Sequence, residues 1–352
     1  MFFTADIPEA FRGQPDRPLV QKDLIPVGEP FRNYLHQHGR SCPLYFTYAD
    51  LQDYSHTESL RDPFGRHTHW ERVIYRDGRI ATLYPRLLDA YLLLCRNEEA
   101  PNRVASAWRI EAIDFCEYAN SMPFRITLSD NAGLSDYFFV KQADASRIYG
   151  LELEQLLGDT HIAFICEGDT LVERAIRGVF ADDYLANSAL LDPLRKLEAA
   201  KNFVDFNLRC FSRLLGDMRS YNFVVQDGQD SSLRFRAIDF DQQAYEGALS
   251  MYFPHFYSEN RLLVDWVIEF LSPSEIGSIE HSTLLNLRRS AAAHSGRLQQ
   301  LLEVLGRDEL TPHYKFIQLR KALAGYHGSD VFLRCHSMGD LLRKQLDHLG
   351  IC

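Results

Sequence analysis

The sequence lacks several patterns that would place it in a common class. Its seven cysteines include no Cys-x-x-Cys pair, which argues against a zinc knuckle or a redox dithiol and favours reduced, mostly buried thiols. No apolar run approaches the roughly 20 residues of a membrane span. Acidic residues outnumber basic ones, 48 to 38, and the net charge of −10 disfavours nucleic acid as a partner. Asp6 and Glu9 interrupt the apolar start too early for a signal peptide, so we expect a soluble, cytoplasmic protein.

The chain does have the composition and length of an ordinary globular protein with more than one packed unit. Hydrophobic residues make up 46% of its 352 residues and charged residues 24%. Strand-like residues at 72–84 flank an Asp77-Gly78 pair, which is typical of a hairpin turn, and residues 98–102 resemble a linker. We therefore predict an amino-terminal accessory unit at 1–110, a small sheet-rich lobe at 111–178 and a helical lobe at 179–352.

The two later units follow an α+β pattern. Asp192 can cap a helix whose first residue is Pro193, and the apolar residues that follow recur every three or four positions. Ser272 and Glu275 have the spacing of a capping box. The other predicted elements are strands at 124–128, 137–142, 162–165, 170–176, 223–225 and 234–238, and helices at 145–157 and 262–271.

The most informative segment contains two groups of polar residues that suit phosphoryl transfer. Asp217 precedes Asn222 by five positions, after the long helix, and Asp239 and Asp241 follow the last strand of that region. Phosphoryl transfer from a nucleotide needs an acid that orients the attacking hydroxyl, oxygen ligands for magnesium and cations that offset phosphate charge. Carboxylate and amide oxygens are the ligands that magnesium prefers. Asn222 and Asp239 therefore suit a magnesium ion, with Asp241 as a possible further ligand.

The segment Gly-Asp-Met-Arg-Ser-Tyr-Asn at 216–222, with Ile-Asp-Phe-Asp at 238–241, resembles the protein-kinase-like superfamily, which includes aminoglycoside, choline and lipopolysaccharide-sugar kinases. The resemblance implies a two-lobed fold that binds ATP and Mg²⁺ and phosphorylates a hydroxyl of a small molecule, a sugar or a protein. It implies Asp217 as the catalytic aspartate and Arg219 as a cation on the phosphate. Asn222 and Asp239 would be the metal ligands, with Asp241 as a possible third.

The same resemblance implies roles for residues upstream and downstream of this segment. Lys141 would bind the α- and β-phosphates, held by Glu152 or, alternatively, Glu154 on the next helix. The backbone of a hinge at 173–177, with Glu173 and Ala175, would face the adenine. Asp265 resembles the acid that braces the catalytic loop.

Two departures from the family pattern leave other functions open. Leu215 stands where a histidine is usual, and the expected phosphate-covering loop at 129–136 offers only Gly133. A catalytically inactive pseudokinase that serves as a binding or regulatory module is one alternative. A nucleotidyl transferase is another. The sequence does not identify the acceptor.

Overall fold

The chain forms two compact units of mixed α and β structure. The computed structural model describes residues 22–62, 65–96, 108–158, 162–228 and 232–352. We call residues 22–145 and 162–175 the sheet unit, and residues 146–158 and 176–352 the helical unit. The predicted α+β class is confirmed in this form. No helix among these residues is long and apolar enough to cross a membrane.

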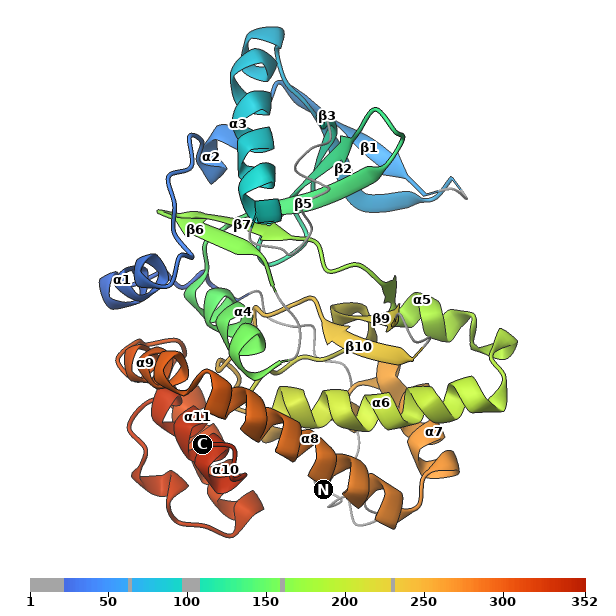
Figure 1. Cartoon of the computed structure of the whole chain (residues 1–352), viewed down its shortest axis with the longest axis vertical. Helices are drawn as coiled ribbons and strands as arrows, with labels where there is room; N and C mark the ends of the chain where they lie inside the picture. Colours follow the sequence, from blue (N-terminus) through green and yellow to red (C-terminus); the bar gives the residue numbers. More distant parts are fainter. Residues whose placement is uncertain (1–21, 63–64, 97–107, 159–161, 229–231) are drawn as a thin grey trace. The chain divides into compact units, whose positions relative to one another are not determined.

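The sheet unit is built around one antiparallel sheet of seven strands in the order β1-β2-β3-β4-β5-β7-β6 (Figure 1). Its strands alternate inward and outward residues, so that Phe124, Ile126 and Leu128 of β4 are buried together. The strands are β1 (His56–Arg61), β2 (His67–Ile74), β3 (Arg109–Phe115), β4 (Phe124–Ser129), β5 (Ser135–Gln142), β6 (Phe164–Glu167) and β7 (Thr170–Arg174). The helices of this unit are α1 (Glu29–Gln37), α2 (Tyr48–Leu51) and α3 (Asp77–Arg96).

The predicted hairpin at 72–84 is wrong, because Asp77 begins the long helix α3. The amide of Ile80 donates to the carbonyl of Arg76, and Leu83 and Leu87 point into the core at helical spacing. Buried residues recur at helical spacing from Leu83 to Cys95, and this period outweighs the local turn preference of an Asp-Gly pair.

The predicted boundary near residue 110 also differs from the structure. Strand β3, which begins at Arg109, pairs with β2 through Glu71 and Phe115 and with β4 on its other side. Residues before 110 therefore complete the same sheet, and separating them would expose the backbone edge of β3. The predicted linker at 98–102 lies outside the described residues.

The helical unit places a three-stranded sheet, in the order β10-β9-β8, against the long helix α6 (Pro193–Ser212) (Figure 1). As predicted, Asp192 caps α6 by accepting a hydrogen bond from the amide of Arg195 at 2.8 Å. The strands are β8 (Val179–Phe180), β9 (Phe223–Asp227) and β10 (Leu233–Ala237). The helices are α4 (Ala145–Leu157), α5 (Ala181–Ala186), α7 (Arg261–Phe270), α8 (Pro273–Ala293), α9 (Ser295–Leu305), α10 (His313–His327) and α11 (Met338–His348).

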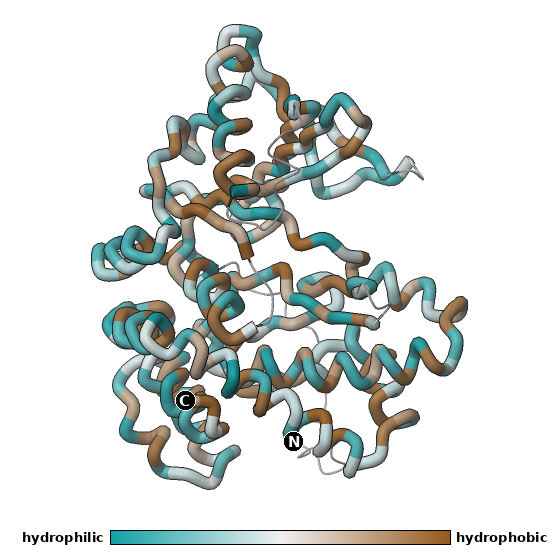
Figure 2. The backbone as a smooth tube through the Cα atoms, in the orientation of Figure 1, coloured by the Kyte–Doolittle hydropathy of each residue, from teal (hydrophilic) through white to brown (hydrophobic). Residues whose placement is uncertain are grey.

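An aromatic cluster joins α6 to this small sheet. The rings of Phe206 and Phe223 have their centroids 4.7 Å apart, and those of Phe223 and Phe235 are 5.6 Å apart. All three side chains are fully buried. Hydrophobic residues are mixed with hydrophilic ones along α6 (Figure 2). Burial of such rings is a main source of stability. The cluster anchors the start of β9 and the end of β10. The candidate catalytic residues precede β9 and follow β10 in the chain.

Candidate active site

The loop that follows α6 is held in an unusual backbone conformation. Leu214, Asp217 and Ala244 all have positive φ values, of 55°, 60° and 50°. Side chains other than glycine rarely adopt this region. The amide of Ala244 donates to the carbonyl of Leu214 at 2.9 Å, and Leu215 bridges to Gln243, so the loop is tied to the segment after β10. These bonds hold the strained backbone in place.

Asp217, Arg219 and Asn222 come together in this loop, as the sequence predicted. The Nε of Arg219 donates to Oδ1 of Asp217 at 2.9 Å, and Nη1 of Arg219 donates to Glu259 at 3.0 Å. Nδ2 of Asn222 donates to the backbone oxygen of Asp217 at 2.7 Å and to its Oδ2 at 3.2 Å. Both carboxylate oxygens of Asp217 therefore accept a hydrogen bond from a residue of its own loop.

The pKa of Asp217 is raised from 3.8 to about 7, mainly because the side chain is buried. The hydrogen bond and positive charge of Arg219 oppose this shift, while the negative charges of Asp239 and Glu246 add to it. Desolvation of the carboxylate outweighs the single ion pair. The group therefore titrates near neutral pH, where a general base is most effective.

Asp239 is fixed next to Asn222 by the backbone. The carbonyl of Asn222 accepts hydrogen bonds from the amides of Ile238 at 3.0 Å and Asp239 at 3.4 Å. The carboxylate of Asp239 accepts a further bond from the amide of Asp241 at 2.9 Å. The two predicted metal-binding segments, 217–222 and 238–241, thus form one site.

Arg147, a residue that the sequence analysis did not identify, neutralises part of this site. Its Nη1 lies 3.2 Å from Oδ1 of Asp239 and 3.0 Å from Oδ1 of Asp241, and its Nη2 donates to the carbonyl of Ile238 at 3.2 Å. The side chain of Arg147 is 3% exposed, that of Asp241 7% and that of Asp239 33%. Nothing in the sequence near 147 links it to residues more than 90 positions away, so no local signal could have found it.

Helix α4 is fixed to the same segment by two further residues. The hydroxyl of Ser146 donates to the carbonyls of Asp241 at 3.0 Å and Gln243 at 2.7 Å. A Cβ added to Gly150 would lie 2.8 Å from the Cβ of Phe240, closer than such atoms pack. Glycine at this position therefore lets the helix approach the segment.

The donors around Asp239 partly fit a magnesium ion. Asn222 directs its Nδ2 toward Asp217, and no described residue donates to its Oδ1. The carboxylate of Asp239, whose amide donates to the carbonyl of Asn222, is 33% exposed. Oxygen donors of this kind suit magnesium. Asp241 fits less well, because Arg147 is bonded to its carboxylate. No cluster of three or more His, Cys, Asp or Glu side chains in the described residues is arranged to hold a metal.

In the sheet unit, the predicted phosphate-binding lysine has a carboxylate partner on the neighbouring strand. The Nζ of Lys141, on β5, donates to Oε1 of Glu173, on β7, and both side chains are buried. The side chain of Glu173 therefore pairs with Lys141, whereas the sequence analysis assigned a role only to its backbone. The chain crosses from the sheet unit to the helical unit directly after Ala175, within the predicted hinge.

The predicted partners of Lys141 on α4 have other partners in the helical unit. Both carboxylate oxygens of Glu152 accept bonds from Nη2 of Arg297, at 2.8 and 2.6 Å. Glu154 is bonded to the buried guanidinium of Arg213. The spacing of α4 could not distinguish these carboxylates, because their partners lie far along the chain.

The predicted phosphate-covering loop is a self-contained turn between β4 and β5. The side chain of Asp130 accepts hydrogen bonds from the amides of Ala132 at 2.9 Å and Leu134 at 2.8 Å, and its carbonyl accepts one from Gly133 at 3.2 Å. These amides are consequently engaged, and the buried carboxylate of Asp130 would repel a phosphate. The turn is poorly suited to the predicted role.

Asn260, rather than Asp265, braces the loop that contains Asp217. The Nδ2 of the buried Asn260 donates to the carbonyl of Met218 at 2.9 Å and to that of Pro254 at 3.2 Å. Asp265 has a side chain that is 57% exposed, and it lies 3.9 Å from Arg261 on the same helix. The prediction for Asp265 is therefore wrong, because the polar residue that faces the loop precedes α7 instead of lying within it.

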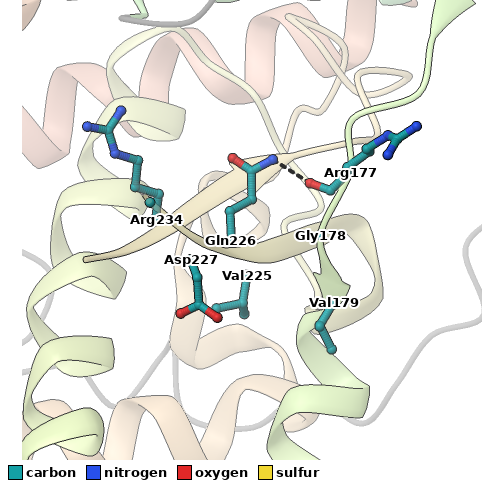
Figure 3. Close-up of a pocket in the computed structure, with 8 residues that line it drawn as sticks. Arg177, Gly178, Val179, Val225, Gln226, Asp227 and Arg234 are labelled. Atoms are coloured by element: carbon teal, nitrogen blue, oxygen red, sulfur yellow. Dashed lines mark hydrogen bonds between the residues drawn. The ribbon is translucent and has the colours of Figure 1, made fainter. Parts of the chain in front are cut away.

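A cavity of about 800 Å³ lies beside the β9–β10 hairpin (Figure 3). It is lined by the segment at 177–179, which begins at the last residue of the predicted hinge, and by Asp227 and Arg234 of the hairpin. Gln226 donates to the carbonyl of Arg177 across it (Figure 3). Gly178 has a φ of 155°, and a Cβ there would meet Val224 at 2.7 Å. This cavity contains none of the predicted catalytic or metal-binding side chains.

No model of a known protein family matches the sequence, and a search of curated proteins finds no significant match. The resemblance to kinases therefore depends on the residues of the 216–241 segment and on their geometry.

Proposed function

We propose that the chain is an ATP- and magnesium-dependent phosphotransferase that moves a phosphoryl group to a hydroxyl of a small molecule, a sugar or a protein. The main support for this proposal is that Asn222 contacts both aspartates. Its side-chain amide donates to Asp217, and its backbone carbonyl accepts a hydrogen bond from the amide of Asp239. Phosphoryl transfer needs an acid and two oxygen ligands in this proximity.

Asp217 orients the acceptor hydroxyl and takes its proton. Its pKa of about 7 leaves a substantial ionised fraction at neutral pH while keeping the carboxylate basic enough to accept a proton. Arg219, bonded to the same carboxylate, offsets phosphate charge. Turnover should accordingly rise with pH through about 7.

Asn222 and Asp239 would hold magnesium, which would neutralise charge on the phosphate oxygens. Arg147 supplies a second, permanent positive charge next to Asp239. Because the carboxylate of Asp241 is buried on that guanidinium, Asp241 positions Arg147 and does not itself bind the metal.

A non-catalytic binding module is the second candidate. Two observations favour it: Arg147 already pairs with Asp239 and Asp241, and the turn at 130–134 directs its amides at Asp130 rather than outward. A protein of this type would bind a nucleotide or a partner without transferring a phosphoryl group.

Thermal melts with ATP and ADP, with and without magnesium, test the proposal. A ligand at 100 times its dissociation constant stabilises the folded state by about 2.7 kcal/mol, a rise of a few degrees in a chain of this size. We expect a magnesium-dependent rise in wild type, its loss in Asp239→Ala and its retention in Asp265→Ala, which removes an exposed aspartate.

Three outcomes separate the candidates. A magnesium-dependent shift with slow ATP hydrolysis supports the phosphotransferase. A nucleotide shift that is independent of magnesium and of Asp239 supports the binding module. No shift with any nucleotide would reject the enzyme.

A further inference from the structure

Arg219 is held between two carboxylates of the helical unit, those of Asp217 and Glu259. Its Nε donates to Oδ1 of Asp217 at 2.9 Å, and its Nη1 donates to Oε1 of Glu259 at 3.0 Å. Asp217 and Arg219 are buried, whereas Glu259 is partly exposed. Glu259 therefore acts on the candidate base through one shared guanidinium, although the sequence analysis assigned it no role.

The turn that carries Glu259 is fixed to the loop of Asp217 by its neighbouring residue. The guanidinium carbon of Arg219 lies 5.1 Å from the ring centroid of Tyr257. The hydroxyl of Tyr257 donates to the carbonyl of Met251 at 2.7 Å. The same carbonyl accepts the amide of Asp217 at 3.1 Å. The backbone around Glu259 thus places its carboxylate next to Arg219.

Sharing Arg219 between two acids limits how it binds Asp217. An arginine and a carboxylate often form two parallel N–H···O bonds, which stabilise the carboxylate strongly. Asp217 accepts one bond from Arg219, at Oδ1, and its Oδ2 accepts one from Asn222 at 3.2 Å. Because Nη1 is bonded to Glu259 instead, Asp217 keeps a single charged donor. A carboxylate with fewer charged donors is the stronger base.

We propose that Glu259 is a positioning residue, which holds Arg219 so that Asp217 stays able to accept the proton of the acceptor hydroxyl. This role depends on the proposed phosphotransferase activity. In that reaction the hydroxyl oxygen bonds to the γ-phosphorus of ATP, the bond from that phosphorus to ADP breaks, and the hydroxyl proton passes to Asp217. Glu259 touches none of the reacting atoms and acts through Arg219.

Other titratable groups that act on Asp217 are Asp239, Glu246, Tyr221 and Tyr257. The two acids raise the pKa of Asp217, and Glu246 is itself bonded to Lys315 at 3.1 Å. Burial raises the pKa of both tyrosines, so they stay neutral near pH 7. None of these groups changes when Glu259 is substituted. A changed titration of Asp217 in such a variant therefore reports on Glu259 and Arg219.

Carbon-13 NMR of the protein labelled at the carboxyl carbon of aspartate follows the proton on Asp217 without an acceptor. Asp217→Asn identifies the signal. We expect Glu259→Gln to lower the apparent pKa of Asp217 by about 0.5 to 1 unit, because a negative charge is lost and Arg219 can form a second bond. Glu259→Asp keeps the charge and should restore at least half of the shift. The matched control is Glu269→Gln, which removes an exposed glutamate of α7 and should leave the pKa unchanged.

ATP hydrolysis by the same proteins distinguishes this role from the proposed function. In Glu259→Gln the rising limb of the pH profile of kcat should move to lower pH by the same amount. The plateau should fall roughly threefold, as expected for a weaker base, while KM for ATP stays as in wild type.

An unchanged pKa of Asp217 in Glu259→Gln would overturn the inference, whether or not the protein hydrolyses ATP. An equal shift in Glu269→Gln would also overturn it, because the effect would then follow net charge alone. A lowered pKa in a protein whose wild type does not hydrolyse ATP would support the hold of Glu259 on Asp217 and reject the phosphotransferase instead.

Discussion

The guanidinium of Arg147 lies 3.0 Å from the carboxylate of Asp241, and the same nitrogen lies 3.2 Å from Asp239. A buried cation is thus shared between two acidic groups, one nearly inaccessible and one a third exposed. Because unpaired buried charges are costly, each of the three groups depends on the others. This dependence links helix α4 to the candidate metal-binding segment.

Replacing Arg147 by alanine should destabilise the protein and make its stability depend on magnesium. Removing one partner of a buried ion pair costs about 3 to 5 kcal/mol, since the remaining charges lose their compensation. A divalent cation can substitute for the lost guanidinium. We therefore expect millimolar magnesium to raise the melting temperature of Arg147→Ala by several degrees more than that of wild type.

The control for this comparison is Arg261→Ala, which breaks an exposed pair with Asp265 at 3.9 Å. An exposed pair contributes less than about 1 kcal/mol, so this variant should melt close to wild type in both buffers. If Arg147→Ala also has the melting temperature of wild type, with and without magnesium, Arg147 does not compensate the charge of the two carboxylates.

Gly150→Ala and Gly277→Ala should have opposite effects on stability. Alanine favours a helix over glycine by about 1 kcal/mol, and a Cβ on Gly277 of α8 meets nothing within 4 Å, so Gly277→Ala should stabilise. At Gly150 of α4 the Cβ would lie 2.8 Å from that of Phe240, and such overpacking costs about 1 to 3 kcal/mol. Urea denaturation measures both, and two stabilising substitutions would contradict the close approach of α4.

Rules that act over a few residues predicted much of the fold. The Asp192 cap of α6 and the capping box of Ser272 and Glu275 are both present, because each needs only a side chain and an amide three positions away. The strands and helix between residues 124 and 174 also follow the predicted order. Local turn chemistry failed at Asp77, where a long apolar period decides the structure.

The site was predictable only where its residues are close in sequence. Asp217, Arg219 and Asn222 lie within six positions and do contact each other. Arg147 comes from a helix that packs on the site only in the folded chain, and Asn260 from a turn about 40 positions beyond it. Sequence spacing contains no information on such partners.

The effects of substituting Glu152 and Arg297 on the free energy of unfolding should be strongly non-additive in a double-mutant cycle. The carboxylate of Glu152 is fully buried and both of its oxygens accept bonds from Arg297. Glu152→Gln and Arg297→Gln should each cost about 2 to 4 kcal/mol, and the double variant should lose little more than either. Denaturant unfolding of the four proteins measures the coupling energy, which we expect to exceed about 1 kcal/mol.

The exposed pair of Lys344 and Asp347, with nitrogen and oxygen 3.0 Å apart, is the matched control. Its coupling energy should stay below about 0.5 kcal/mol, since solvent screens it. A loss of nucleotide affinity in Glu152→Gln without a change in stability would instead support the predicted role of Glu152 beside Lys141.

The last prediction concerns the pH dependence of Asp217→Asn. Asp217 titrates at 3.8 as an unperturbed group and at about 7 in the folded protein. Between these pH values the unfolded chain releases the proton and the folded protein keeps it, so the wild-type free energy of unfolding falls as pH rises from about 4 to 7 and is level above.

Asparagine cannot ionise and tolerates the positive φ of this position, so the variant avoids that loss. We expect the stability of the Asp217→Asn variant relative to wild type to rise by about 2 to 4 kcal/mol from pH 4 to pH 8, on top of a pH-independent cost for the hydrogen bond that the new amide nitrogen cannot accept. Urea denaturation at both pH values measures the difference. A difference that does not change with pH would show that the carboxylate is not desolvated, and would remove the basis for Asp217 as a base active near neutral pH.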